Sequence, residues 1–357
     1  MGKSASQYRT KEVNKIKARM TKNGIQSYTK TRDKYFRVEE EAFKERMKKL
    51  EPLLIDAHIM EKVLAAYTNR TGKTPTRLVW NEKCFPNKCT DKAGLPCLKW
   101  ECNKCQATVA QVIMVIVSSK NAGDNALIPF YENLFNLEHI KDWSMKDWLL
   151  VEEDDMIRLI PFMNTLTVPT IRLIFEQFCE EKRFPTKIEH MARFPEVKLK
   201  LSALVVTNVT GFPTNRIATD LHVARIAPPL GWVKIARTTD PEGVCQELAT
   251  YAVVNNMDHW MWRLNDVCGG MGQVLDGLIQ SKDADKSNNP LKEAFQSVSG
   301  TYYNNDPRPL EIYDLLYDTY KAALKDKKPN QQTQLAKEDQ VRAGSKRKRT
   351  KVERWGY

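Results

Sequence analysis

Long apolar runs are missing from this chain of 357 residues. A membrane-spanning helix needs about 18 or more consecutive apolar residues. The best candidate, ATVAQVIMVIVSSK, is shorter and is more simply interpreted as a buried helix. The first residues, MGKSASQYRTKEV, also lack the apolar core of a secretory signal. We therefore expect a soluble protein that is not secreted and has no membrane partner.

Two further patterns are absent: the polar–apolar alternation that marks β-strands, and any internal repeat. Between residues 106 and 279, helical apolar patterns alternate with short loops that contain Gly, Pro, Asn or Asp. Apolar residues recur three and four apart in EPLLIDAHIMEKVLAAY (Glu51–Tyr67) and again in PLEIYDLLYDTYKAAL, which predicts two amphipathic helices. With 42% apolar residues the chain can bury a sizeable core, and we predict an all-α fold.

Positive charge is in excess and is concentrated at the two ends of the chain. The formal net charge is +12, and the first 50 residues carry 15 lysines and arginines. The tail ends in GSKRKRTKVERWGY. Such ends suit a polyanion, because lysine and arginine neutralise phosphates and release counterions. The alternative is that they only keep the protein in solution. The cluster of Lys346, Arg347, Lys348, Arg349 and Lys351 is also typical of a nuclear import signal, so we expect a nuclear protein.

These patterns divide the chain into five segments. Residues 1–50 form a basic arm, partly helical or disordered, and residues 51–105 hold a helix and a cysteine-rich, zinc-binding segment. Residues 106–280 form the helical domain. Residues 281–324 contain a linker, KDADKSNNP, and a C-terminal helix, and residues 325–357 are a basic tail predicted to be disordered.

Five of the eight cysteines lie in CFPNKCTDKAGLPCLKWECNKC. The pairs C-x4-C and C-x2-C have the form of two halves of a tetrahedral thiolate site. We predict a structural zinc ion bound by Cys84, Cys89, Cys102 and Cys105, with Cys97 as a spare or a substitute. An iron–sulfur cluster and a set of unliganded thiols remain as alternatives.

Three stretches carry a family resemblance, in the right order along the chain. They are VIMVIVSSKNAGD (Val112–Asp124), FPEVKLKLSALVVTNVTGFPTNRIATDLHVAR (Phe194–Arg225) and HWMWRLNDVC (His259–Cys268). Together they resemble the helix-hairpin-helix DNA glycosylase superfamily, in particular its endonuclease III branch. The resemblance implies a two-lobed helical domain that flips a base out of double-stranded DNA into a cleft between the lobes. It implies a base-excision enzyme, a DNA glycosylase with or without abasic-site lyase activity.

The resemblance also assigns roles to individual residues. Asp220 matches the carboxylate that stabilises the oxocarbenium-like transition state, and Lys200 matches the lysine that forms a Schiff base with the sugar. Asn121 matches the side chain that fills the gap left by the flipped base. The other DNA-binding candidates are Lys120, Lys198 and Arg216.

The residues around Lys200 and Asp220 support these roles and leave alternatives. On a helix that starts near Leu199, Lys200 shares a face with Ala203, Leu204 and Thr207, and an apolar environment lowers the pKa of a lysine. Alternatively, Lys200 extends into solvent from the first helical turn. Alternatively, Asp220 serves only as the N-cap of the helix that follows it, a position that Thr219 could also take.

The sequence departs from the family pattern at three places. Glu196-Val197-Lys198 replaces the hairpin Gly-Val-Gly, whose bare backbone would approach a DNA phosphate. The loop at residues 212–219 is longer than in the family, and the four-cysteine iron–sulfur signature expected beyond Cys268 is missing. Two alternative functions therefore stay open: a DNA-binding protein without catalysis, and a base-flipping transferase that acts on modified thymine in DNA.

Overall fold

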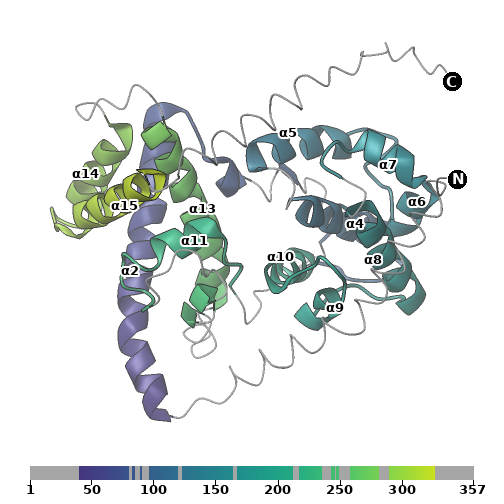
Figure 1. The fold of residues 1–357 in the computed structure, drawn as a ribbon, viewed down its shortest axis with the longest axis horizontal. Coiled ribbons are helices and arrows are strands. Elements are labelled where there is room, and N and C mark those ends of the chain that lie inside the picture. Colours follow the sequence, from purple (N-terminus) through teal and green to yellow (C-terminus); the bar gives the residue numbers. More distant parts are fainter. Residues whose placement is uncertain are drawn as a thin grey trace, which may run out of the picture.

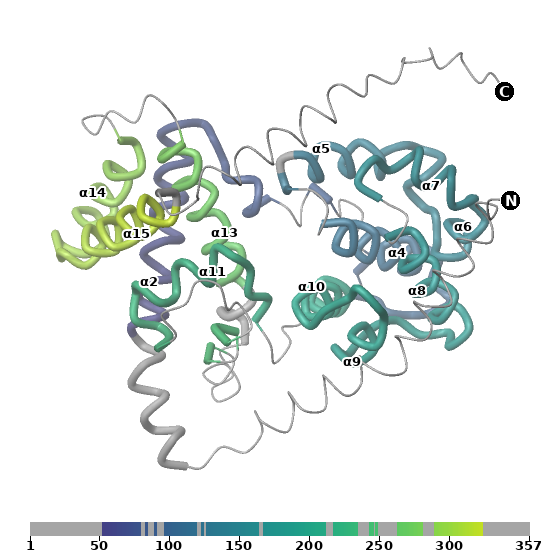
Figure 2. Tube along the Cα trace, viewed as in Figure 1, coloured from purple at the N-terminus to yellow at the C-terminus, as the bar shows by residue number. Residues whose placement is uncertain are grey.

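The structure of the chain is a computed structural model, shown in Figure 1 and Figure 2. The structure describes residues 40–79, 83–84, 89–90, 96–119, 123–163, 167–211, 217–234, 243–245, 247–248, 258–280 and 289–325. The side chains of residues 40–51, 125, 258–262 and 324–325 lie outside this description. The described residues form helices and no strand, apart from an isolated antiparallel bridge between Thr90 and Pro96. The predicted all-α fold is confirmed.

The described helices are given in chain order. Their bounds are α2 Glu40–Thr71, η1 Thr76–Val79, α4 Asn103–Ser118, α5 Asp124–Phe135, α6 Met145–Leu150, α7 Glu153–Leu159, α8 Thr167–Glu181, α9 Ile188–Ala192, α10 Leu199–Thr210, α11 Leu221–Ile226, α13 Asp258–Gln280, α14 Pro290–Tyr302 and α15 Arg308–Lys325. The two amphipathic helices expected from the sequence lie within α2 and α15. Helix α14 was not expected, because the polar KDADKSNNP segment before it led us to predict only one helix there.

The buried apolar residues form two large clusters. The first comes mainly from α4 to α10, and the second from α2, α11, α13, α14 and α15. Figure 1 shows the same two groups of helices. Helix α4 lies deep in the first cluster, since all its residues from Val112 to Ser118 are buried. Because each group has its own core, the residues at their junction need not be apolar.

Local sequence signals explain where several helices begin and end. Ser144 and Asp147 form a capping box at the start of α6, and Asn289 accepts hydrogen bonds from two backbone amides before Pro290 begins α14. Gly211 ends α10 in the left-handed conformation, with φ of 71°, which glycine adopts without steric cost. These caps fix the ends of helices whose apolar faces form the two cores.

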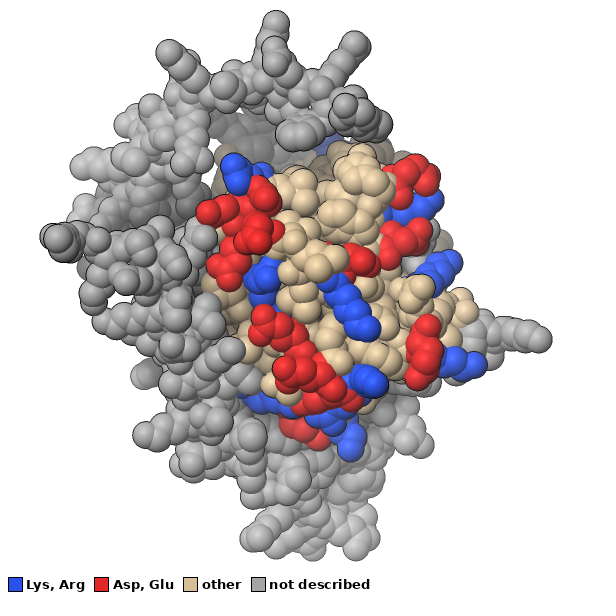
Figure 3. All heavy atoms as spheres, turned by 90° about the vertical axis from the view of Figure 1, so that its right-hand side faces the viewer, with Lys and Arg blue, Asp and Glu red and all other residues tan. Residues whose placement is uncertain are grey.

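Figure 3 shows one face of the molecule, on which basic and acidic side chains are interspersed. Most of the basic arm (residues 1–50) and of the basic tail (residues 325–357) lies outside the described residues, as does the cluster predicted to direct nuclear import, whereas residues 40–50 form the start of α2. Among the helices that the structure describes, none is long and apolar enough to cross a membrane.

A buried carboxylate holds the second cluster together. Asp56 on α2 is fully buried. Its Oδ1 and Oδ2 accept hydrogen bonds from Arg308 Nε and Nη2 on α15, at 2.9 and 2.7 Å. Trp232 Nε1 also donates to Oδ2, at 3.0 Å. Since three segments distant in the sequence meet on one carboxylate, Asp56 joins α2, α15 and the segment after α11.

We expect Asp56→Ala to lower the free energy of unfolding by about 3 kcal/mol, because it leaves the Arg308 guanidinium and the Trp232 N–H without their buried partner. Asp155→Ala is the matched control, since Asp155 pairs with Arg158 one turn away on an exposed surface. Urea unfolding followed by circular dichroism measures both. Equal midpoints for the two variants would contradict the role given to Asp56.

Candidate functional site

Lys200 and Asp220, the two predicted catalytic residues, lie close enough for their charges to interact. Lys200 is the second residue of α10 and is half-buried, and Asp220 immediately precedes α11. Burial lowers the pKa of Lys200, Asp220 acts to raise it, Arg77 to lower it and Asp124 to raise it. Burial prevails, so the pKa is lowered in the direction expected from the apolar face of α10. A lowered pKa favours the neutral amine, which is the nucleophilic form.

Asp220 also caps α11, as the alternative interpretation of the sequence proposed. Its Oδ1 accepts hydrogen bonds from the backbone amides of His222 and Val223, at 2.9 and 3.0 Å. The cap fixes the carboxylate at the helix N-terminus, where the partial positive charge of the helix favours an anion. The second oxygen, Oδ2, takes no part in this cap. Capping α11 and interacting with Lys200 are therefore compatible.

Three charged residues that the sequence analysis did not assign to the site lie around this pair. Arg77 in η1 and Asp266 on α13 form an ion pair, with 3.2 Å between Nε and Oδ1, and Asp124 is the first residue of α5. Burial raises the pKa of Asp266 to about 6, Arg77 lowers it and Asp220 raises it. The only hint in the sequence that Arg77 and Asp266 belong to the site was that each is a charged residue beside apolar ones, in TRLVW and RLNDVC.

Burial shifts the pKa values of two groups in this arrangement towards neutrality. The arrangement combines an amine whose pKa is lowered with a carboxyl group whose pKa is raised to about 6, and a capping carboxylate lies near both. Groups whose pKa values are shifted towards neutrality serve as nucleophile, general base and general acid. The geometry therefore suits nucleophilic attack assisted by a carboxylate.

The predicted DNA-binding residues have a mixed outcome. Lys198 is exposed and lies at the N-terminus of α10, where a phosphate could approach. Lys120, Asn121 and Arg216 lie outside the described residues. Glu196, which stands where the family resemblance places a glycine, has a φ of 63°. The backbone there has the left-handed conformation that a glycine would favour.

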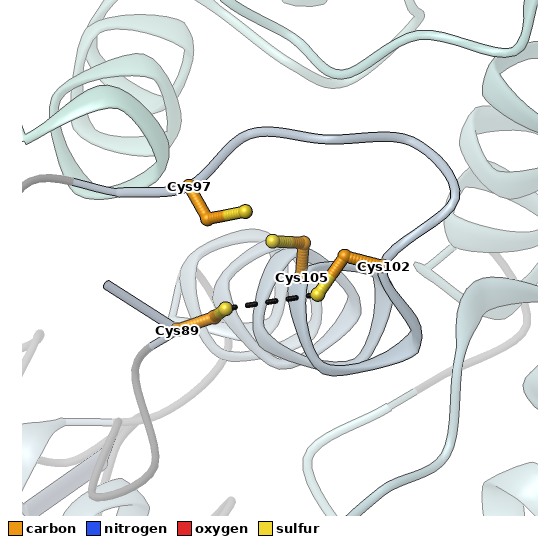
Figure 4. A group of neighbouring side chains, drawn as sticks. All are labelled: Cys89, Cys97, Cys102 and Cys105. Atoms are coloured by element: carbon orange, nitrogen blue, oxygen red, sulfur yellow. Dashed lines mark hydrogen bonds between the residues drawn. The ribbon is translucent and has the colours of Figure 1, made fainter. Parts of the chain in front are cut away.

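A second candidate site consists of four cysteines, shown in Figure 4. The Sγ atoms of Cys89, Cys97, Cys102 and Cys105 all lie within 4.8 Å of one another, and those of Cys89 and Cys102 are 3.7 Å apart. A Zn–S distance of about 2.3 Å places two sulfurs of a tetrahedral site about 3.8 Å apart. The four thiols therefore fit a tetrahedral metal centre, which is compatible with zinc without identifying the ion.

The set of ligands differs from the predicted one at one position. Cys97 joins the group instead of Cys84, because the bridge between Thr90 and Pro96 reverses the chain and brings Cys97 back against Cys89. The Cys97 amide donates to the Cys89 carbonyl oxygen, at 3.3 Å. Cys84 is buried in the first apolar cluster, where burial raises the pKa of its thiol to about 12. Burial also raises the pKa of the Cys105 thiol, which does belong to the group, so Cys84 is set apart by its position outside the four clustered thiols.

The start of α4 favours a thiolate at the cysteine centre. Cys102 is the residue immediately before α4, and the backbone amide of Cys105 lowers the pKa of its thiol. Helix N-termini stabilise thiolates in this way. Bound there, a metal ion would hold the bridged residues 89–90 and 96–97, called the cysteine hairpin below, against the first turn of α4. Its contribution would be structural.

The cysteine hairpin also contacts the end of the helix that carries Lys200. A Cβ added at Gly211, the C-cap of α10, would lie 3.0 Å from Pro96 Cδ and 3.1 Å from Pro96 Cγ. Pro96 therefore packs against the bare backbone of Gly211, and the candidate metal centre is in direct contact with the end of α10.

No model of a known protein family matches the chain, and no curated protein matches it.

We expect Cys97→Ala to reduce the zinc bound by the purified protein and Cys84→Ala to leave it unchanged, because only Cys97 belongs to the group of four thiols. Elemental analysis by mass spectrometry gives the metal content per chain. Cys84→Ala is the matched control, since it removes a buried thiol from the same cysteine-rich segment. Loss of metal from Cys84→Ala alone would restore the ligand set predicted from the sequence.

We expect Gly211→Ala to weaken zinc retention against a chelator more than Gly231→Ala. The two glycines have φ values of 71° and 73°, so alanine costs about 1–2 kcal/mol of backbone strain at either position. A Cβ at Gly231 meets nothing within 4 Å, whereas at Gly211 it pushes against Pro96. Equal zinc loss from both variants would show that Pro96 and α10 are uncoupled.

Proposed function

We propose that this protein is a DNA-binding base-excision enzyme: a DNA glycosylase with abasic-site lyase activity on a two-lobed helix-hairpin-helix fold. The observation that carries the proposal is that Lys200, on the first turn of α10, lies close enough to the capping carboxylate of Asp220 for their charges to interact. A nucleophilic amine and a fixed carboxylate are the two groups that this reaction needs.

The fold of the described residues supports the proposal. Helices α9 and α10 pack together and are joined by the turn at residues 193–198, as the two helices of a hairpin would be. The positive φ of Glu196 in this turn agrees with a glycine position in the hairpin. The candidate site takes Lys200 from the first group of helices, Asp220 and Asp266 from the second, and Arg77 from η1 between them.

The chemistry follows from the two groups. A base inside a duplex is out of reach, so it must first be flipped into the site. The Lys200 amine then attacks the anomeric carbon of the sugar, a carbon–nitrogen bond forms to lysine, and the bond to the base breaks. The Asp220 carboxylate stabilises the positive charge that develops on the sugar. Loss of a proton and opening of the sugar ring give a Schiff base, from which the 3′ phosphate is eliminated.

The remaining parts of the proposal concern binding and location. Double-stranded DNA is bound through its phosphates by Lys198 and by the basic segments at both ends of the chain. A structural zinc ion at Cys89, Cys97, Cys102 and Cys105 holds the hairpin that contacts α10. The basic cluster near the C-terminus supports a nuclear location.

A second candidate function is a DNA-binding protein that has the fold without the chemistry. The carboxylate of Glu196 favours it, because an acid in the hairpin turn opposes a DNA phosphate. In this alternative, Lys200 and Asp220 keep only structural roles.

We expect the protein to form a covalent adduct with duplex DNA that carries an abasic site or a damaged or modified base, in the presence of borohydride, which reduces the Schiff base. The variant Lys200→Arg should abolish the adduct, because it keeps the charge and removes the primary amine. Lys187→Arg, a matched change of an exposed lysine immediately before α9, should retain it. Adduct formation should rise with pH as Lys200 loses its proton.

Asp220→Asn separates the two functions of the carboxylate. Asparagine caps a helix about as well as aspartate, so α11 should remain stable while the charge is lost. Base release should then fall by about 100-fold or more if the carboxylate stabilises the transition state. An absence of adduct and of base release across the whole panel, with DNA affinity unchanged in Asp220→Asn, would reject catalysis and support the second candidate.

A further inference from the structure

The junction between the two groups of helices is polar and passes through one short element. Helix η1 packs against α13 on one side and α5 on the other. Arg77, in η1, is only 7% exposed. Burying a guanidinium costs several kcal/mol in lost hydration unless carboxylates and other hydrogen-bond acceptors surround it. Arg77 must therefore be held by partners from both sides.

The partners of Arg77 come from both neighbouring helices. On α13, Nη2 donates to Asn265 Oδ1 and Nε lies 3.2 Å from Asp266 Oδ1. On α5, Asp124 Oδ2 lies 3.9 Å from Nη1. Gln273 of α13 closes the network: its Oε1 accepts from the Arg77 amide and its Nε2 donates to Asp124 Oδ2, both at 3.1 Å. One guanidinium and one amide thus join α5, η1 and α13.

A glycine in the middle of α13 provides the space for Arg77. A Cβ built on Gly269 would lie 2.7 Å from Arg77 Cγ, a distance that real Cβ contacts do not reach. The Cγ atom is near the base of the side chain, so it cannot move aside without moving the guanidinium. The position of the guanidinium therefore depends on Gly269 having no side chain.

The charges around Lys200 include this guanidinium. Asp220 faces Lys200 from the start of α11, Asp124 from α5 and Arg77 from η1. Behind Arg77, Asp266 on α13 completes the group. Arg77 opposes the protonation of Lys200, and the two carboxylates favour it. Displacing the guanidinium would change the balance in favour of the ammonium form.

We propose that Arg77 is a positioning residue for the reaction proposed above: fixed between α5 and α13, it holds the two groups of helices so that Lys200 and Asp220 face each other. Its fixed cation also keeps the Lys200 amine ready for attack. The catalytic part of this inference rests on the proposed function. The position of Arg77 and its effect on Lys200 can be measured without any activity.

The test uses two alanine substitutions in the same helix of the full-length protein. Gly269→Ala displaces Arg77 without changing a charge, and Gly277→Ala is the matched control, because a Cβ there meets nothing within 4 Å. The pKa of Lys200 is measured by NMR after reductive methylation with ¹³C-formaldehyde. Its signal is identified as the one absent from Lys200→Arg.

We expect the pKa of Lys200 to rise towards that of an exposed lysine in Gly269→Ala and to stay unchanged in Gly277→Ala. Borohydride trapping should then require a higher pH in Gly269→Ala alone. If Gly269→Ala does not fold, Gln273→Ala loosens Arg77 by removing the acceptor of its backbone amide, and it should shift the pKa in the same direction.

The outcomes separate this inference from the proposed function. An unshifted pKa in a folded Gly269→Ala or Gln273→Ala variant would overturn the role of Arg77, even if the wild-type protein forms the adduct. A shifted pKa in a protein that forms no adduct with any substrate would support the position of Arg77 and reject the catalytic proposal.

Discussion

The buried guanidinium of Arg77 is the interaction on which the rest of the arrangement depends. Each group of helices has its own apolar core, so neither core determines how the groups are oriented to each other. Apolar surfaces can slide with little change in energy, whereas a buried cation tolerates few positions. It is stable only where Asp124, Asp266 and Asn265 converge on it. We infer that the polar junction selects one orientation.

The same burial that makes this junction specific also sets its chemistry. Removing charged groups from water shifts their pKa values towards the neutral form, which lowers the pKa of Lys200 and raises that of Asp266 to about 6. The Asp220 carboxylate is fixed nearby by two backbone amides at the start of α11. Burial therefore shifts the pKa values of two neighbouring groups in opposite directions, as acid–base chemistry requires.

Features that depend on residues close together in the sequence could be predicted from it. Helical periodicity located α2 and α15, and the capping role of Asp220 followed from its place before an apolar run. The spacing of the cysteines predicted a cluster of thiols that could hold a metal ion, but it favoured Cys84 and gave Cys97 only as a spare or a substitute, because the reversal that brings Cys97 to Cys89 is a tertiary feature. Arg77 was missed for the same reason. Its partner Asn265 is 188 residues away, and no local pattern shows such a contact.

The helix that carries Lys200 is supported at both ends by groups that the apolar core does not provide. At its start, Lys200 lies near the charges of Asp220, Arg77 and Asp124. At its end, Gly211 lies against Pro96 of the cysteine hairpin. Among the described residues of the hairpin, the Cys97 amide donates to the Cys89 carbonyl oxygen, and the Cys89 amide donates to Thr108 Oγ1 on α4. Bonds from an ion to the four thiolates would add to this rigidity. An ion bound there would thereby limit how far α10, and with it the Lys200 amine, can move.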